Sequence, residues 1–377
     1  MTYNLGAIGM GHWFERLQRS IQRGGRIAIT KAVGLKSYEE KIGIMEKLGL
    51  GRENYFQINP GDPLPENFFQ DIQLAYIASP NQFHASQILQ CIDHGKAVVV
   101  EKTFGINKSE MDKVIDYIKK NNWYNKVHLH LHYLRKALTM SLPSLLVNAT
   151  REYGKVISVA ATFFEQENAE DRRRTWILKP ESGGIFLDWI HPIEVLYKYA
   201  GAEFADCRGV ETFIIRPEYD GVNPTAVQAV FNVKGRLFAD SATVTIRVGK
   251  GFPHGVTCKT IRFYLETDAF LEINYADSEQ EYNSDFRGTW QLWEVPDGKP
   301  RVVEGGIPSG ATPYELLVRD IINMLEGGNN TMTIEDIQKI YEPQWKFQDV
   351  SKNVKPVSNE SAIKIFIKAG IEKTSFP

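Results

Sequence analysis

The first third of the chain alternates short apolar runs with longer stretches in which apolar residues recur at helical spacing. The apolar runs predict strands, and the amphipathic stretches predict helices. Strands are expected at Tyr3–Ile8, Arg26–Gly34, Gln73–Ala78 and Ala97–Val100. Helices are expected at about Gly11–Gln22, Ser37–Leu48, Gln82–His94 and Lys108–Asn121. Strands that alternate with helices in this way form a parallel sheet with right-handed crossovers, and wholly apolar runs indicate strands covered on both faces.

The pattern changes near residue 125, where long alternating runs begin. A strand at Val127–His132 and a helix at about Ala137–Val147 come first. The runs that follow are typical of an antiparallel sheet, and they are Lys155–Phe164, Thr225–Val233, Arg236–Val248, Thr260–Glu266 and Thr289–Val295. We therefore predict an α/β Rossmann domain that binds a dinucleotide over residues 1–125. An α+β domain with a large, mostly antiparallel sheet is predicted over residues 126–377.

Few helices are available to cover the second sheet. Those at Phe186–Tyr199 and Pro313–Leu325 are expected to cover one face, and Glu360–Gly370 predicts a final helix. The other face is expected to pack against another subunit, which gives a homodimer or homotetramer. The second domain would thus serve oligomerisation as well as substrate binding, with the site between the two domains.

Composition and charge exclude several classes of partner. The net charge of −2 provides no attraction for nucleic acid or anionic lipid, and no apolar run is long enough to span a bilayer. The N-terminal MTYNLGAIGMG has neither a basic region nor a cleavage site, so no signal peptide is expected. The three cysteines, Cys91, Cys207 and Cys258, are scattered, which suggests a reducing compartment. We expect a soluble, cytoplasmic protein.

The first strand leads into a glycine turn, NLGAIGMGHWFERL, in which Gly9, Gly11 and Phe14 occupy the G-x-G-x-x-G/A positions. Gly9 would make the tight turn, and Gly11 would let a pyrophosphate approach the backbone at the start of the helix. Phe14 replaces the glycine that lets helix and strand pack closely, so a shifted helix is expected. The turn residues expected to contact a dinucleotide are Gly9, Met10, Gly11, His12 and Trp13. The alternative is a turn that binds nothing.

The end of the second strand, Ala32-Val-Gly-Leu-Lys-Ser37, distinguishes between cofactors. A carboxylate there would bond the ribose 2′-hydroxyl of NAD, whereas a basic residue accommodates a 2′-phosphate. Lys36 and Ser37 are suited to the phosphate. NADP is therefore predicted in preference to NAD, which stays possible, and the alternative is that Lys36 is a solvated surface lysine.

Two further segments resemble a known family. AYIASPNQFH at Ala75–His84 and GKAVVVEKTFG at Gly95–Gly105 are similar to the T/S-P-N-x-x-H and E-K-P motifs of the Gfo/Idh/MocA family of NAD(P)-dependent sugar and cyclitol oxidoreductases. Thr103 stands where that family has proline. The resemblance implies that Lys102 is the active-site lysine and that His84 opens a helix. It implies cofactor contacts from Ser79, Pro80, Asn81, His84 and Glu101. The alternative is that Glu101 and Lys102 form a surface ion pair.

The segment ESGGIFLDWIHPIE at Glu181–Glu194 resembles the family's G-G-G-x-x-x-D-x-G-x-H-x-x-D, one residue shortened. The resemblance places Asp188 and His191 beside the substrate. We expect His191 to be the general base and Asp188 its orienting or substrate-binding partner. Alternatively, Asp188 caps a helix and His191 is merely packed. Arg174 and Trp176 resemble an R-x-W segment that would line the substrate pocket.

Other short segments resemble glucose-6-phosphate dehydrogenase, namely EKTFG, HYLRK, IRVGK and YELL. A phosphorylated substrate would need cations, and the candidates are His132, Arg135, Lys136, Lys250 and the run Asp171–Arg174. His132 and Lys250 are therefore assigned to the substrate site. His128, His130 and His132 share one face of a strand, but no metal is expected, because neighbours on one strand rarely converge on one ion.

The predicted function is NADP-dependent hydride transfer between nicotinamide and a sugar or polyol hydroxyl. His191 would take the hydroxyl proton while Lys102 stabilises charge on the oxygen. A sugar-phosphate dehydrogenase is one alternative, and a non-catalytic dinucleotide or sugar sensor is another. The partner in each case is a small molecule.

Overall fold

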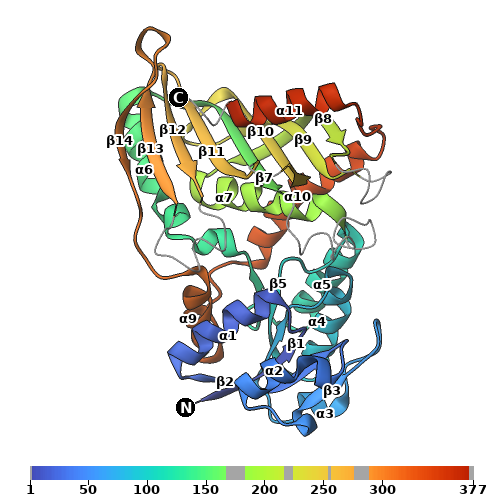
Figure 1. The fold of residues 1–377 in the computed structure, drawn as a ribbon. Helices are drawn as coiled ribbons and strands as arrows, with labels where there is room; N and C mark the ends of the chain where they lie inside the picture. The colour runs from blue at the N-terminus through green and yellow to red at the C-terminus, as the bar shows by residue number, and fades with distance from the viewer. Residues whose placement is uncertain (1, 167–182, 216–223, 254–255, 276–287, 373–377) are drawn as a thin grey trace. The chain divides into compact units, whose positions relative to one another are not determined.

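The structure is a computed structural model that describes residues 2–166, 183–215, 224–253, 256–275 and 288–372. Its chain divides into two compact units. The first unit comprises Met1–His132 and Pro313–Ile337, and the second comprises Tyr133–Thr312 and Gln338–Pro377 (Figure 1). Among the described residues, no helix has the length and apolar character needed to cross a membrane.

The first unit is built on a six-stranded parallel sheet in the order β3-β2-β1-β4-β5-β6. Its strands are β1 (Tyr3–Ile8), β2 (Ile27–Gly34), β3 (Tyr55–Gln57), β4 (Leu74–Ile77), β5 (Ala97–Glu101) and β6 (Val127–His130). The strand order changes direction between β1 and β4, and in such sheets ligands bind at the carboxyl ends of the strands beside that point. The predicted Rossmann sheet is confirmed. β3 was not predicted from the sequence.

The helices of the first unit include a segment from far along the chain. They are α1 (His12–Gly24), α2 (Tyr38–Leu48), α3 (Glu66–Phe69), α4 (His84–Asp93), α5 (Lys108–Lys120) and α9 (Pro313–Leu325). The apolar side of α9 joins the core that Phe14 and Leu17 of α1 form with the sheet. The expectation that Pro313–Leu325 covers the antiparallel sheet is therefore wrong, because α9 lies beside α1 (Figure 1) and its apolar residues belong to the core of the first unit.

The second unit contains an eight-stranded sheet in the order β14-β13-β12-β11-β7-β10-β9-β8. Its strands are β7 (Val156–Gln166), β8 (Glu203–Phe213), β9 (Ala226–Lys234), β10 (Phe238–Phe252), β11 (Cys258–Leu265), β12 (Ala269–Asn274), β13 (Thr289–Glu294) and β14 (Arg301–Gly306). Every pairing is antiparallel except that of β7 with β10. The predicted mostly antiparallel sheet is confirmed, although β8, β12 and β14 were not predicted.

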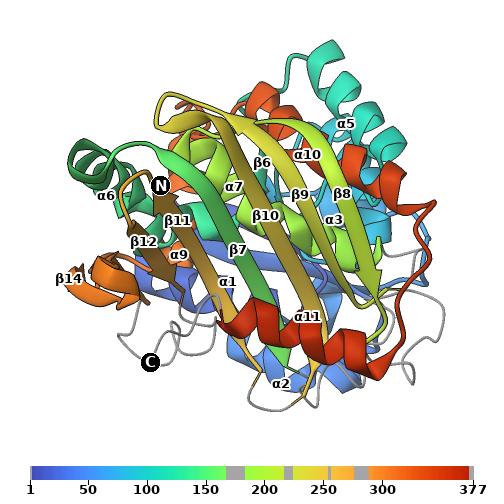
Figure 2. The ribbon, with the colours of Figure 1, turned by 90° about the horizontal axis from the view of Figure 1, so that it is seen from above.

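The two faces of this sheet carry different helices. On one face lie α6 (Ala137–Tyr153) and α7 (Ile190–Ala200), and the ring of Trp189 stacks at 4.0 Å on Phe347 of α10 (Ile334–Ser351). On the other face, α11 (Glu360–Glu372) lies across the ends of β7 and β10 (Figure 2). Neighbouring side chains of a strand point to opposite faces. Accordingly, Phe164 of β7 packs under α11, while Phe163 packs against Tyr133 on the other face.

Candidate functional site

The two glycines of the turn between β1 and α1 have different roles. The backbone conformation requires a glycine at Gly9, whereas Gly11 leaves open space at the start of α1. Gly9 has a φ of +83°, and a Cβ there would lie 2.7 Å from the carbonyl of Ala78 at the end of β4. A side chain at Gly9 is therefore excluded by both conformation and contact. Gly11 is the N-cap of α1 without a side-chain cap, and a Cβ there would meet nothing within 4 Å. The start of α1 thus offers backbone N–H groups beside open space, as a pyrophosphate site needs.

Phe14 occupies the position of the third glycine and is completely buried. Its ring lies 6.4 Å from that of Tyr76 on β4, so the aromatic side chain fills the space between helix and sheet. Trp13 is half-buried beneath the guanidinium of Arg16, at 4.8 Å. Met10 is buried, and its carbonyl accepts a hydrogen bond of 3.0 Å from Lys41. The side chain of His12 lies outside what the structure describes.

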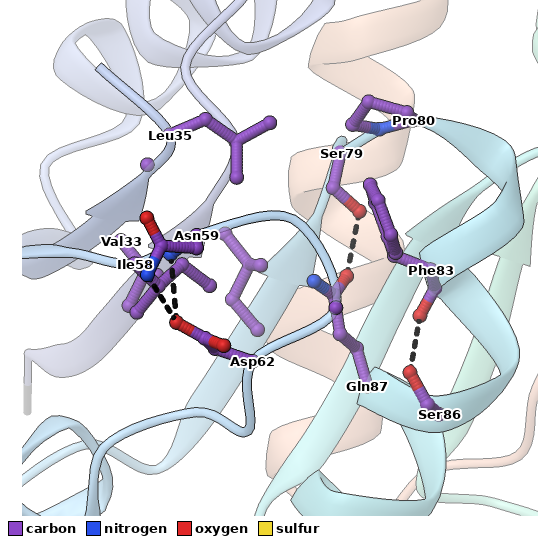
Figure 3. Close-up of a pocket in the computed structure, with 14 residues that line it drawn as sticks. Val33, Leu35, Ile58, Asn59, Asp62, Ser79, Pro80, Phe83, Ser86 and Gln87 are labelled. Atoms are coloured by element: carbon purple, nitrogen blue, oxygen red, sulfur yellow. Dashed lines mark hydrogen bonds between the residues drawn. The ribbon is translucent and has the colours of Figure 1, made fainter.

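A pocket opens at the carboxyl ends of β1, β2 and β4, beside the glycine turn (Figure 3). The empty space in it, counted together with space open to solvent, is about 420 Å³. Leu35 and Asp62 lie on one side and Pro80 and Phe83 on the other (Figure 3). Apolar walls with a few polar groups suit the adenosine end of a dinucleotide.

The polar groups of this pocket are held by local bonds. One oxygen of Asp62 accepts bonds of 2.9 Å from both the backbone N–H and the side-chain amide of Asn59. On the opposite side, the hydroxyl of Ser79 donates to Gln87 at 2.6 Å. Asn59 and Asp62 were not predicted from the sequence, since they follow β3, a strand of three residues that shows no periodicity.

Lys36 and Ser37, the predicted ligands of a 2′-phosphate, both bind Glu40. Ser37 is the N-cap of α2 in a capping box, in which its hydroxyl accepts from the N–H of Glu40 and its own N–H donates to the Glu40 carboxylate at 3.0 Å. The Lys36 ammonium lies 3.6 Å from the same carboxylate. The bond from the Ser37 backbone is the main cause that lowers the pKa of Glu40. A carboxylate therefore does stand beside this turn, contributed by the helix that follows it.

His84 ties together the two loops that carry the family motifs. As the resemblance implies, it opens α4. In its buried ring, Nδ1 lies 2.7 Å from the carbonyl oxygen of Thr103 and Nε2 lies 2.8 Å from that of Ser79. A neutral ring donates to one of these oxygens, and a protonated ring donates to both. Burial lowers the pKa of this imidazole, and the two carbonyls act in the opposite direction. Through this bridge, the Ser79–Asn81 loop is held against the segment that contains Lys102.

Lys102 is half-buried and directly follows the wholly buried strand β5. The preceding residue, Glu101, is buried and accepts hydrogen bonds from the hydroxyls of Tyr76 and Tyr314, the latter at 3.2 Å. Burial raises the pKa of Glu101 to about 7, although both tyrosines and the charge of Lys102 act to lower it. A surface ion pair between Glu101 and Lys102 is therefore excluded by the burial of Glu101.

In the second unit, His191 stands in the first turn of α7, which directly continues the 3₁₀ segment η7 (Gly184–Trp189). The N-cap of α7 is Trp189 without a side-chain cap, so capping is not the role of Asp188. His191 is 9% exposed, and its ring lies 4.8 Å from that of Tyr133. Its Nδ1 is 3.5 Å from a carboxylate oxygen of Glu194, one turn later.

Asp188 instead belongs to a cluster of charges on the sheet. Its carboxylate is 2.8 Å from Lys250 on β10. Lys250 also lies 3.6 Å from Glu165 on β7, which in turn lies 2.8 Å from Lys259 on β11. Burial acts to raise the pKa of Glu165, but the two lysines hold it at about 2. Among the described residues, the cluster therefore pairs two cations with two anions.

The remaining predicted residues lie in several places. His132 is buried in the first unit, with its ring 5.6 Å from that of Trp13. Lys136 is buried, with its ammonium 4.9 Å from the ring of Tyr133. Arg174, Trp176 and the run 171–174 lie outside the described residues. Among the residues that are described, no group of three or more potential ligands is arranged to hold a metal ion.

Comparison with known proteins identifies the first unit. Residues 5–128 match the sequence profile of GFO_IDH_MocA, described as an oxidoreductase family with an NAD-binding Rossmann fold. These residues belong to the Gfo/Idh/MocA oxidoreductase family. The predicted family and the predicted class of enzyme, an oxidoreductase, are thereby confirmed. Among curated proteins, none matches the chain by sequence.

Solved structures with the same fold extend over nearly the whole chain. The 3-ketoreductase KijD10 from Actinomadura kijaniata, in complex with NADP and TDP-benzene, is 15% identical with a TM-score of 0.73 and covers 95% of this chain and 100% of its own. For myo-inositol 2-dehydrogenase from Lactobacillus plantarum, the identity is 18%, the TM-score 0.71, and the coverage 93% and 98%. Aldose-aldose oxidoreductase from Caulobacter crescentus, in complex with glycerol, is 14% identical with a TM-score of 0.71, and the match covers 94% of this chain and 100% of that enzyme. At these identities, the likeness is one of fold.

Proposed function

We propose that this protein is an NADP-dependent dehydrogenase or reductase that acts on a sugar or polyol hydroxyl, or on the corresponding carbonyl. The observation that carries this proposal is the position of Lys102. It follows a buried strand of a dinucleotide-binding sheet, and His84 holds its loop against the Ser79–Asn81 loop. The KijD10 structure contains NADP, and the inositol and aldose enzymes bear the names of polyol and sugar substrates, which supports the same class of activity.

The residues of the first unit fit a dinucleotide. The open space at Gly11 would receive the pyrophosphate at the start of α1, and the pocket around Leu35 and Phe83 would receive the adenosine. Lys36 and Ser37 would bind a 2′-phosphate once Lys36 exchanges Glu40 for it. When bound, the nicotinamide supplies hydride transfer.

The chain's own residues would handle the proton and the charge. In the oxidation, the C–H bond breaks as hydride leaves the substrate carbon, and the hydroxyl proton passes to His191. The Lys102 ammonium stabilises negative charge on the oxygen as the carbonyl forms. Reduction of a carbonyl uses the same residues in reverse.

Within the described residues, the pairing of charges in the cluster around Lys250 favours a neutral substrate over a sugar phosphate at that place. A phosphate dianion needs several cations to bind it. Lys250 and Lys259, the two lysines of the charge cluster, are compensated by Asp188 and Glu165. A neutral sugar or polyol instead needs both donors and acceptors, and a cluster of ammonium and carboxylate groups supplies both.

We further propose that the chain is cytoplasmic and forms a homodimer or homotetramer. The three cysteines form no disulfide with one another in the structure, in keeping with a reducing compartment. The sheet face that carries α11 would provide the contact between subunits, since α11 lies across only one end of it (Figure 2). Sedimentation that shows a monomer at micromolar concentration would contradict this assembly.

A substrate and cofactor screen tests the proposed activity. Purified protein is incubated with NADP or NAD and a panel of polyols, sugars and sugar phosphates, and reduced nicotinamide is followed by absorbance. We expect turnover of an unphosphorylated sugar or polyol with NADP, which Lys102→Ala abolishes while it still binds the dinucleotide. Turnover of sugar phosphates alone would support the alternative substrate. Dinucleotide binding without turnover on any compound would identify a sensor.

A further inference from the structure

A buried carboxylate lies behind the imidazole that the proposed function uses as its base. His191 and Glu194 are three residues apart in the first turns of α7, so both side chains lie on one face of the helix. Nδ1 of His191 is 3.5 Å from Oε1 of Glu194, whose side chain is completely inaccessible to solvent. Burial of an ionised carboxylate is costly unless an opposite charge or a donor compensates it. His191 is a titratable group at ion-pair distance from this carboxylate, and its protonated ring would compensate the negative charge.

Among the described residues, other charged and titratable groups also lie near this pair. The ring of Tyr133 lies 4.8 Å from that of His191, and the Lys136 ammonium lies 4.9 Å from the Tyr133 ring. On η7 and the strands, Asp188 and Glu165 bind the lysines of the charge cluster. Glu194 is thus the carboxylate that faces the imidazole at ion-pair distance.

We propose that Glu194 is a positioning residue for His191, which holds Nδ1–H of the imidazole toward its carboxylate and leaves Nε2 to take the substrate proton. This inference rests on the proposed function, in which His191 is the base. The same arrangement of a buried carboxylate, an imidazole and a reacting hydroxyl fixes the tautomer of catalytic histidines and stabilises the imidazolium that forms. It assigns to Glu194 the orienting role for which the sequence suggested Asp188.

The first test is a double-mutant cycle on the enzyme's preferred substrate. Glu194→Gln is nearly isosteric, and it removes the negative charge. We expect it to lower kcat by at least about tenfold, since a general base contributes on the order of 10²–10⁴, and to shift the acid limb of kcat/KM to lower pH. In a His191→Asn background, the same change should cost less than about twofold, because residues that act as a unit are not additive. Glu194→Asp keeps the charge and should keep the position of the acid limb.

Dinucleotide affinity serves as the folding control, because the glycine turn lies in the first unit and should bind equally in every variant. The inference would be overturned if Glu194→Gln lowered kcat by the same factor in the wild-type and His191→Asn backgrounds and left the acid limb of kcat/KM unshifted. Glu194 would then be a structural residue.

A second test needs no substrate. Histidine NMR of the full chain, with the His191 signal assigned from the His191→Asn variant, follows protonation of that imidazole. We expect His191 to lose its proton at lower pH in Glu194→Gln than in the wild type, since the carboxylate favours the protonated ring. An unchanged titration would overturn the inference. A shifted titration in a protein that turns over no sugar would uphold the pairing and refute the proposed function.

Discussion

Glu101→Gln isolates the energetic effect of one buried carboxyl group. The side chain is 8% exposed and accepts hydrogen bonds from Tyr76 and Tyr314, and burial raises its pKa from 4.5 to about 7. One pKa unit corresponds to about 1.4 kcal/mol, so a shift of this size is worth about 3 kcal/mol. The folded state holds the proton more tightly than the unfolded state. Its stabilising contribution is therefore complete below the unfolded pKa and is lost as pH rises through the folded pKa.

Urea unfolding of the wild type and of Glu101→Gln over a series of pH values tests this reasoning. The amide introduced by this substitution keeps an oxygen that can accept from both tyrosines but has no charge to bury. The free energy of unfolding of the variant relative to the wild type should therefore rise by about 3 kcal/mol between about pH 4.5 and pH 8. All other titrating groups cancel in this difference. Parallel pH profiles for the two proteins would show that Glu101 ionises as it does in water, and the argument from burial would be refuted.

The turn, the loop bridge and the cofactor site each lead to a further prediction. Gly9→Ala should destabilise the fold by at least about 1 kcal/mol, which is the lower end of the cost of a side chain in the left-handed region. Gly11→Ala should keep the melting temperature and weaken dinucleotide binding at least about tenfold. Normal dinucleotide binding by Gly11→Ala would place the pyrophosphate elsewhere. His84→Gln should lower turnover. The stability of the wild type relative to this variant should fall as pH falls below about 6.5, since burial lowers the pKa of His84; a stability difference that does not change with pH would contradict this. Glu40→Gln should raise, and Lys36→Ala should lower, the ratio of kcat/KM for NADP to that for NAD; an unchanged ratio in both variants would remove Lys36 from the cofactor site.

Most of the strands that the sequence pattern predicted have side chains buried on at least one face, although β12, which is buried at five of its six residues, was missed. β5 is buried at every residue, and the apolar runs of β1 and β4 are equally plain. β8 and β14 form the two edges of the second sheet, and many of their side chains are exposed. Their sequences therefore lack a clear apolar alternation, which is the signal used to find strands. Proline within the sequence of α10 similarly obscured a helix of 18 residues.

The candidate site was predictable where its residues are close in sequence and was not where its partners are distant. The glycine turn and Lys102 stand in local patterns that a sequence displays directly. The partner of Asp188 is Lys250, on a strand that the fold brings to η7, and no local pattern indicates this pairing. Glu194 was present in the quoted motif, but only the continuous turn from η7 into α7 shows that its carboxylate faces His191.

The two groups proposed for catalysis share one physical feature, which is a buried carboxylate behind each of them. Glu101 precedes Lys102, and the Lys102 ammonium is among the charges that lower the pKa of Glu101, so the two attract. Glu194 lies behind His191. An ionised Glu101 supports the positive charge that stabilises a forming alkoxide, and Glu194 supports the imidazolium that forms when the proton arrives. Because Glu101 ionises only near pH 7, oxidation should weaken below neutral pH for two separate reasons, protonation of Glu101 and protonation of His191. Glu101→Gln should therefore remove one component of the acid limb of kcat/KM and leave the component that depends on Glu194.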